Sequence, residues 1–443
     1  MHTPPTSSSP LPSPELFPIP PEFVVVHDAE WSEPRSSGPS SPDIGSSSRR
    51  ASSKLKFVRT TAFEFPIDSE RLFVLSRGNA FGGNIQLTQC DTPSGAFGLD
   101  FGSDDMFTEK HFLESTQVNG AERVKIEIAV EYPELGSGWF DWVKVCSLRR
   151  RGREGQNGLG IFTPNDSSSK LSGYRIEIIV TFPQPRSSSG PSSSSLPVLK
   201  INNFETDTKM FSHQIDNLST TILFRSISLR TASAPIFIES LRARRANFQT
   251  SNAPIEGTFC VSSFLNLETS NAKIRSSVLL ENTDSRRFSQ LNMVSSNSPI
   301  LSSIILSSPS RPTGGNFAVL AKTSNSPVNI TFPSAPPYHN LQLRVSTMLA
   351  DADVHLPDTY EGRFDVQTNT GSADVSFLNH DNLSRSTSQK KKAAERIKRR
   401  ILEYERHEAA RISGWVNVSG EEEGKFRGEV QVITSMAGAS LQM

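Results

Sequence analysis

Three side chains that could hold a divalent metal alternate along one stretch of the chain: Asp351, Asp353 and His355. Alternating residues of a β-strand share one face, so two carboxylates and an imidazole would lie together there. This combination of ligands suits several divalent ions. The stretch also falls in a turn of a repeat, where Asp is a common turn residue. The three residues are therefore weak metal candidates, and we expect no bound cofactor.

Carboxylates of the same region raise one enzymatic alternative. Glycoside cleavage needs two carboxyl groups close together, and four aspartates would converge if they lay on adjacent coils of a β-helix. They are Asp351, Asp353, Asp365 and Asp374. Elsewhere, the eight histidines form no HExxH or HxH pair, and no Gly-x-Ser-x-Gly elbow occurs. The sequence favours a non-enzymatic protein, with a carbohydrate-active enzyme on a β-helix scaffold as an alternative.

The densest charge cluster is a basic run near the C-terminal end. Residues 387–412 are rich in Ala, Lys, Arg and Glu, a composition that predicts a helix. Three interpretations stay open: a solvated helix inserted into a loop, a nuclear-import segment, or a helix that contacts an anionic surface. The basic residues are Lys390, Lys391, Lys392, Arg396, Lys398, Arg399 and Arg400.

A second chemical motif lies near the other end, where Arg49-Arg50-Ala51 precedes Ser52. A basic pair before a serine in a Ser/Pro-rich tail is typical of a site for a basophilic kinase. Phosphorylation would add negative charge to the tail. Ser52 is therefore a candidate phosphosite.

The elements that carry the aspartates belong to a repeat in the last half of the chain. Each unit has an apolar residue, then Thr or Ser two positions later, a turn, a small residue and an aliphatic anchor. A period near 20 residues predicts a solenoid of stacked coils. The eight anchors are Ile236, Ile255, Ile274, Ile300, Val328, Val354, Val375 and Leu441.

Two turn lengths occur within the repeat, and each has its own turn residue. Asn252, Asn271, Asn297 and Asn325 lie in the shorter turns, whereas Gly371 and Gly438 lie in the longer ones. Asn and Gly tolerate a left-handed backbone, which explains their presence in turns. If the coils stack in register, we also expect the Asn side chains to form a ladder.

The composition divides the chain into four regions. Residues 1–54 are rich in Ser and Pro and predict a disordered tail. Within it, the apolar patch Phe23–Val26 fits a local cluster, a docking motif or a strand added to a sheet edge. Residues 55–183 alternate like β-strands and predict a β-rich region that caps or packs on the solenoid. Residues 184–196 form a linker or loop, and residues 197–443 form the solenoid with its helical insertion at 387–412.

The bulk numbers limit the partners and the compartment. Lys+Arg and Asp+Glu are both 46, so net charge gives no reason to expect nucleic acid as a partner. Three widely spaced cysteines argue against a disulfide framework. We see no signal peptide and no 18-residue apolar stretch. These features predict an intracellular protein, cytoplasmic or nuclear, without a transmembrane segment.

The repeat wording, as in Phe248-Gln249-Thr250-Ser251-Asn252-Ala253-Pro254-Ile255, resembles that of adhesin-like β-solenoid domains. Residues 55–443 are similar to uncharacterised basidiomycete fungal proteins with a domain of unknown function, including the step Ser413-Gly414-Trp415-Val416. The resemblance implies a mostly β fold and offers no catalytic residues. We therefore expect a scaffold or binding module with protein or glycan partners; an adhesin-like surface or wall-associated protein is the alternative. The oligomeric state stays open.

Overall fold

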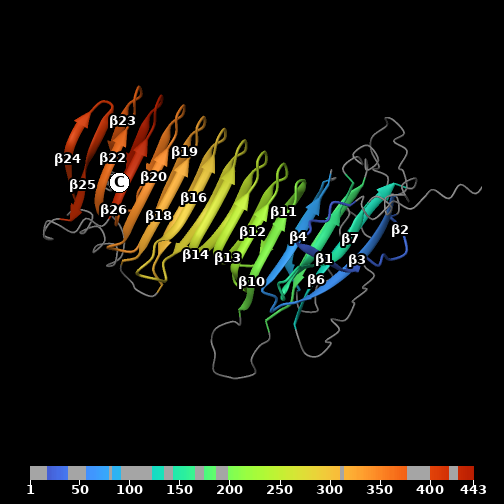
Figure 1. Ribbon diagram of the computed structural model, residues 1–443. Helices are drawn as coiled ribbons and strands as arrows, with labels where there is room; N and C mark the ends of the chain where they lie inside the picture. The colour runs from blue at the N-terminus through green and yellow to red at the C-terminus, as the bar shows by residue number, and fades with distance from the viewer. Residues whose placement is uncertain are drawn as a thin grey trace, which may run out of the picture. The chain divides into compact units, whose positions relative to one another are not determined.

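The computed structural model describes ten stretches of the chain (Figure 1). They are residues 17–37, 56–78, 82–90, 122–133, 143–164, 174–185, 198–309, 314–376, 400–418 and 428–443. All the regular secondary structure in these stretches is β-strand, which confirms the mostly β fold. Their contacts define two compact units, residues 1–186 with 202–212 and residues 187–201 with 213–443. Most of the predicted linker 184–196 lies outside the described residues.

The first unit is a mixed sheet arrangement in which β6 pairs antiparallel with both β3 and β9. β4 and β5 pair in parallel with β8 and β9. The alternating apolar residues of 124–130 and 176–182 are buried, as their period of two predicts. The strands are β1 (Phe23–Asp28), β2 (Arg35–Ser37), β3 (Lys56–Pro66), β4 (Arg71–Arg77), β5 (Gly83–Gln89), β6 (Arg123–Pro133), β7 (Lys144–Arg150), β8 (Gln156–Phe162) and β9 (Arg175–Phe182).

The strands β1 and β2 correct the expectation that residues 1–54 are disordered throughout. β1 pairs antiparallel with β7, and the ring of Phe23 lies 5.1 Å from that of Phe73. The run Phe23-Val24-Val25-Val26 has high β-propensity and enough apolar surface to dock, which a composition averaged over the whole tail conceals. The interpretation of this patch as a strand added to a sheet edge is the one that the structure supports. Ser52 lies outside the described residues.

The second unit begins with parts of β10 (Leu199–Asp207) and β11 (Phe211–Asn217) and contains every later strand. These are β12 (Ile222–Arg230), β13 (Ile236–Gln249), β14 (Ile255–Thr269), β15 (Ile274–Glu281), β16 (Ser289–Ser295), β17 (Ile300–Ser307), β18 (Asn316–Lys322), β19 (Val328–Ser334), β20 (Asn340–Ser346), β21 (Ala352–His355), β22 (Gly362–Gln367), β23 (Ala373–Ser376), β24 (Arg400–Glu408), β25 (Arg411–Val418), β26 (Gly428–Ile433) and β27 (Ala439–Gln442).

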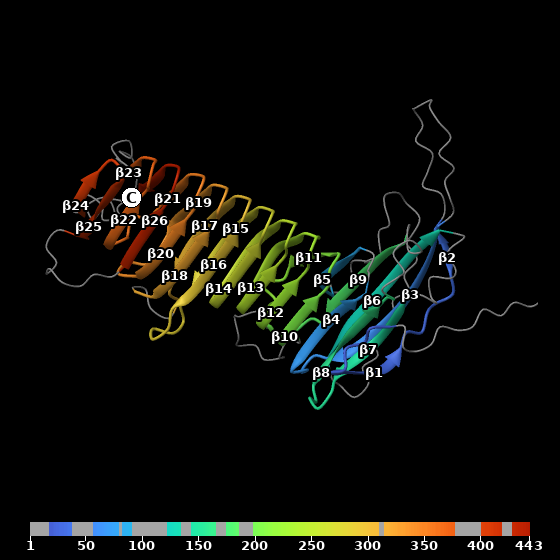
Figure 2. The ribbon, with the colours of Figure 1, turned by 45° about the horizontal axis from the view of Figure 1, so that its top comes forward.

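Each coil of this unit contributes one strand to each of two parallel sheets (Figure 2). Sheet A contains β12, the second parts of β13 and β14, then β16, β18, β20, β26 and β22. Sheet B contains the end of β11, the first parts of β13 and β14, then β15, β17, β19, β21, β27 and β23. The predicted anchors Ile236, Ile255, Ile274, Ile300 and Val328 are paired in register.

The core of the second unit lies between the two sheets. Phe248 of sheet A and Phe259 of sheet B have ring centroids 5.5 Å apart. Ser276 of sheet B donates a hydrogen bond to the sulfur of Met293 of sheet A. Alternate side chains therefore point inward from both sheets, as the repeat predicts, and those between them form the outer faces.

The last coils do not stack in sequence order. β26 lies between β20 and β22, and β27 lies between β21 and β23. The C-terminal coil, residues 428–443, therefore separates coil 340–355 from coil 362–376. Beyond β22, sheet A continues with the antiparallel strands β25 and β24 (Figure 1). The order of the repeats along the sequence gave no indication of this insertion.

The helix predicted at 387–412 is wrong for the part of it that the structure describes. Residues 400–408 form β24, which pairs antiparallel with β25 along its whole length. Pairing with β25, rich in β-branched residues, overrides the helical propensity of the Lys-, Arg- and Glu-rich composition. Arg400 is the first residue of β24. The other basic residues of the run, Lys390 to Arg399, lie outside the described residues.

Within the described residues, no helix has the length and apolar character to cross a membrane.

Candidate functional site

The hydroxyl residues of the repeat belong to its scaffold. The Thr or Ser of all eight units is buried. Each of several hydroxyls donates to a turn carbonyl: Thr269 to Ala253 at 3.4 Å, Thr347 to Ser326 at 3.2 Å, and Thr368 to Ala437 at 2.9 Å. These bonds satisfy turn carbonyls beside the core, so the hydroxyls have a structural role.

The predicted asparagine ladder is present on the outside of the turns. Asn271 donates to Asn252 at 2.7 Å, Asn297 to Asn271 at 2.6 Å, and Asn325 to Asn297 at 2.6 Å. The side-chain amides thus bond along the stack, as in other in-register β assemblies. A left-handed backbone is not the reason for these residues, because Tyr338 is the one non-glycine residue with positive φ in the described part of the chain.

Gly371 is required for a different reason from the one that the sequence suggested. Its φ is not positive, but a Cβ at this position would lie 2.1 Å from the carbonyl oxygen of Ala437. The turn of coil 362–376 therefore approaches the backbone of the C-terminal coil too closely for any side chain. A Cβ at Gly438 would meet first a side-chain oxygen of Asp351, at 3.2 Å.

Two of the three metal candidates, Asp351 and Asp353, bond to the C-terminal coil. Asp351 Oδ1 accepts a hydrogen bond from the backbone N–H of Gly438 at 2.8 Å. Asp353 accepts a hydrogen bond from the hydroxyl of Ser440, and its other carboxylate oxygen lies 3.4 Å from His355 Nε2. In the described stretches, no group of three His, Cys, Asp or Glu side chains is placed to hold a metal ion. These carboxylates hold the inserted coil in place.

The four aspartates of the enzymatic alternative do not converge. Asp365 lies on sheet A, where Arg411 Nε and Nη2 donate to its two carboxylate oxygens at 2.9 and 2.7 Å. Asp353 and Asp374 lie on sheet B with Ser440 between them in register. Two strand spacings separate that pair, roughly 10 Å. Asp365 is therefore separated from the other three aspartates, which lie on or beside the strands of sheet B.

Two buried thiols and two buried imidazoles are also unsuited to catalysis. Burial raises the pKa of the Cys146 thiol to about 12 and, with the nearby Glu281, that of Cys260 to about 11. Burial lowers the pKa of His213 to about 3 and that of His339 to about 4. The two thiols stay protonated near neutral pH, so they are poor nucleophiles. The two imidazoles stay neutral and contact the core.

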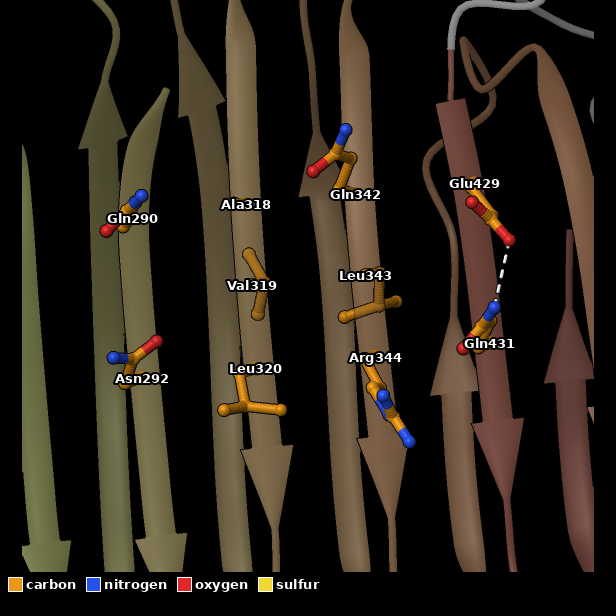
Figure 3. Close-up of a pocket in the computed structure, with 10 residues that line it drawn as sticks. All are labelled: Gln290, Asn292, Ala318, Val319, Leu320, Gln342, Leu343, Arg344, Glu429 and Gln431. Carbon is orange, nitrogen blue, oxygen red and sulfur yellow. Dashed lines mark hydrogen bonds between the residues drawn. The ribbon is translucent and has the colours of Figure 1, made fainter. Parts of the chain in front are cut away.

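The outer face of sheet A contains a shallow depression of about 400 Å³ (Figure 3). Its floor is β18, where Ala318 and Leu320 point outward. Side chains of the neighbouring strands form its sides, Gln290 and Asn292 on β16 and Gln342 and Arg344 on β20. Beyond β20, Glu429 and Gln431 of β26 continue the surface, and Gln431 donates to Glu429 at 2.9 Å.

Strand register explains why the depression forms at this position. Gln290, Ala318 and Gln342 occupy one row across three strands, and Asn292, Leu320 and Arg344 occupy the next row. Ala318 is the smallest of the six side chains, so its neighbours on both sides extend above it. The surface combines an apolar floor, four amide side chains and two opposite charges. It can contact an extended polar chain, but it offers no catalytic group.

Sequence reasoning missed this surface. Its signal was the recurrence of Gln and Asn at the outward positions of strands, between the apolar residues on which the repeat was built. Amide side chains are common in solenoids, and only the register brings Gln290, Gln342 and Glu429 of three separate coils into one row. The C-terminal strand β26 is in this row because of its insertion.

Two further surface features lie on the second unit. On the outer face of sheet B, a depression of about 430 Å³ contains the exposed ring of Phe237 beside Glu239 and Glu256.

On the terminal strands of sheet A, the Arg363 guanidinium lies 5.3 Å from the Trp415 ring centroid, and Trp415 Nε1 donates to Glu405 at 2.9 Å. Arg363 also pairs with Glu405 at 3.3 Å. Trp415, singled out by sequence, thus joins β25 to β22 and β24.

Comparisons with known proteins give a domain but no activity. A family model described as a domain of unknown function (DUF7330) matches residues 246–395, a range that begins within β13 and extends past β23. No curated protein matches the chain. Among solved structures, one described as a "putative cell adhesion protein" from Clostridium sporogenes matches with 9% identity and a TM-score of 0.15, covering 86% of this chain and 99% of that chain. At this TM-score the likeness carries no argument.

Proposed function

We propose that the protein is a non-enzymatic binding module and that the outer face of sheet A around Ala318 is its contact surface. The depression carries this proposal, because it combines an apolar floor with amide and charged side chains on successive rungs. Rigid strands hold these groups at fixed spacing, so little conformational entropy is lost when a partner binds. The four aspartates do not converge on one site, because Asp365 lies on sheet A and pairs with Arg411 while Asp353 and Asp374 lie on sheet B, and this favours binding over catalysis.

The partner that fits this surface is an extended polypeptide. Amide side chains can donate to and accept from the backbone groups of an extended chain, while Arg344 and Glu429 can pair with its charges. A glycan chain shares the hydrogen-bonding requirement. However, glycan sites usually include an aromatic ring, and the residues that line this depression include none. We therefore place the polypeptide first and the glycan second.

A substitution that fills the depression tests the proposal. A displayed peptide library and a glycan array would be screened with the full-length protein, and the selected binders measured against Ala318→Arg. We expect a loss of affinity of tenfold or more, because the long side chain occupies the floor. The matched control is Ser303→Arg, which adds the same charge to the outer face of sheet B. The proposal would be overturned if the selected binders had equal affinity for the unmodified protein and for Ala318→Arg. It would also be overturned if the screens selected no binder.

An adhesin-like role for the same surface is the second candidate, in line with the resemblance of the repeat. It requires exposure outside the cell, whereas we propose an intracellular protein. Localisation of the tagged full-length chain separates the two, together with protease treatment of intact cells. Deletion of residues 390–400 in the same experiment tests the nuclear-import interpretation of the basic run. We also propose that the protein is fungal, as the resemblance implies.

A further inference from the structure

The C-terminal coil, residues 428–443, occupies a slot whose two sides come from other coils. On sheet A, β26 pairs with β20 over six residues and with β22 over five. On sheet B, β27 pairs with β21 and β23 over four residues each. Every one of these pairings joins parts of the chain that are far apart in sequence.

Side chains reinforce both sides of the slot. Asp351 and Asp353 bond to Gly438 and Ser440, partners 87 residues away in sequence. On the other side, Thr368 donates to the carbonyl of Ala437, and Thr370 donates to that of Ser435 at 3.2 Å. Val432 and Leu441 are fully buried in the core. The coil and its slot are therefore complementary in backbone, polar groups and apolar side chains.

The covalent connection to the coil is longer than the distance that it spans. β25 runs antiparallel to β22, so its end lies at the same edge of sheet A as the start of β26. Two strand spacings separate β25 from β26, roughly 10 Å. The connection, residues 419–427, has ten Cα–Cα steps, enough for about 33 Å. Its length does not require the coil to fill the slot of its own chain.

We propose that the slot is an interaction surface for the C-terminal coil of a second copy of this chain, so that two copies can exchange residues 428–443. The exchanged coil makes the same contacts as the resident one, since both come from the same sequence. Exchange therefore costs little beyond the loss of the high effective concentration that the connection provides. The coils that contain β13 and β14 lack this freedom, because each of these strands runs directly from sheet B into sheet A.

A disulfide trap tests the exchange. Ser346 and Ile433 are paired neighbours in β20 and β26, half-exposed on the outer face of sheet A. Their Cα atoms are about one strand spacing apart, within the range that a disulfide bridges. The variant S346C/I433C would be made in a full-length background with Cys90→Ser, Cys146→Ala and Cys260→Ser. Two forms with tags of different mass would be refolded together, oxidised and separated on a non-reducing gel.

We expect disulfide-linked mixed dimers, and the ratio of interchain to intrachain product should rise about tenfold for a tenfold rise in protein concentration. The control pair is Q249C/E268C, neighbours in β13 and β14 that are 19 residues apart in sequence. It should give intrachain product alone. Intrachain product alone for S346C/I433C at every concentration would overturn the proposal.

A second measurement covers the case in which the variants fail to fold. The unmodified chain, in two differently tagged forms, would be refolded as a mixture and captured through one tag. Exchange predicts that the other tag is captured with it after joint refolding, but not when the two forms are folded separately and then mixed. Capture in neither case, or equal capture in both cases, contradicts exchange of the coil.

Discussion

The early and late coils of the second unit use the same two-strand repeat but obtain their stability differently. In the early coils, each rung bonds to the next rung along the sequence, as in the ladder from Asn252 to Asn325, where partners are 19 to 28 residues apart. In the late coils, the bonds that close the stack join residues 65 to 87 positions apart. Closing such long loops costs more chain entropy before any contact forms. The late coils should therefore depend on one element, the C-terminal coil.

The turns of the two regions also present different chemistry. The row that carries the asparagine ladder continues at Leu349 and then Met436, whose backbone N–H groups bond to the preceding turns as those of the asparagines do. The side chains of Leu349 and Met436 are 52% and 63% exposed, and that of Met348 beside them is 56% exposed. The edge of the stack therefore changes from polar to apolar where the sequence order of the coils is broken.

Removal of the C-terminal coil should have the largest effect. Without residues 428–443, β22 and β23 lose their partners towards β20 and β21, so residues 362–418 no longer join the parallel stack. We expect the backbone amides of β22 and β25 to lose hydrogen-exchange protection, while those of β14 to β17 keep it. Protection of β22 equal to that in the full chain would show that the late coils do not depend on this coil.

Acid should weaken the late half through His339. This imidazole is buried between the rings of Phe317 and Tyr360, and its pKa is about 4. The unfolded chain takes up the proton near its ordinary pKa of about 6.5, so stability falls as the pH drops from 6.5 towards 4 and loses no more from this group below that. The expected loss is on the order of 3 kcal/mol.

Replacement of the imidazole by a ring that cannot titrate tests this window. In His339→Phe, the free energy of unfolding from chemical denaturation should change less between pH 7 and pH 4.5 than in the unmodified protein. Phe317→Leu, a change in the same cluster, should lower stability equally at both pH values. An unchanged pH dependence in His339→Phe would exclude the buried imidazole as its source.

Gly371→Ala should separate the turn of coil 362–376 from the C-terminal coil. The added Cβ meets the carbonyl oxygen of Ala437, which belongs to the backbone and cannot rotate away. We expect a destabilisation of about 1–3 kcal/mol, as for other overpacked sites, measured by thermal unfolding. Gly438→Ala is the matched control, since its added Cβ meets a flexible Asp351 side chain instead. Equal effects of the two substitutions would contradict the close-approach explanation.

The fold of the early coils could be predicted because its determinants repeat locally. The hydroxyl, small-residue and anchor positions fix the register, and the register produces the asparagine ladder. The place of β26 and β27 could not be predicted, because the repeat pattern of coil 428–443 fits any gap between two coils. β24 was mistaken for a helix because its charged composition has high helical propensity, although its partner β25 begins at Arg411, with only two residues between the strands. The depression around Ala318 depends on that same register between distant coils, so composition gave no indication of it.

The smallest effect should come from changes to the outer ladder, and it tests whether the chemistry of the turns separates the two regions. Asn297 bonds to both Asn271 and Asn325, so Asn297→Ala removes two exposed hydrogen bonds. Because these amides can bond to water instead, we expect a loss of about 1 kcal/mol. Leu349→Asn would extend the ladder from Asn325 by one rung and should stabilise the protein by about 0.5 kcal/mol, measured by denaturant unfolding. A destabilising Leu349→Asn would mean that the apolar turn contributes packing that its exposure does not reveal.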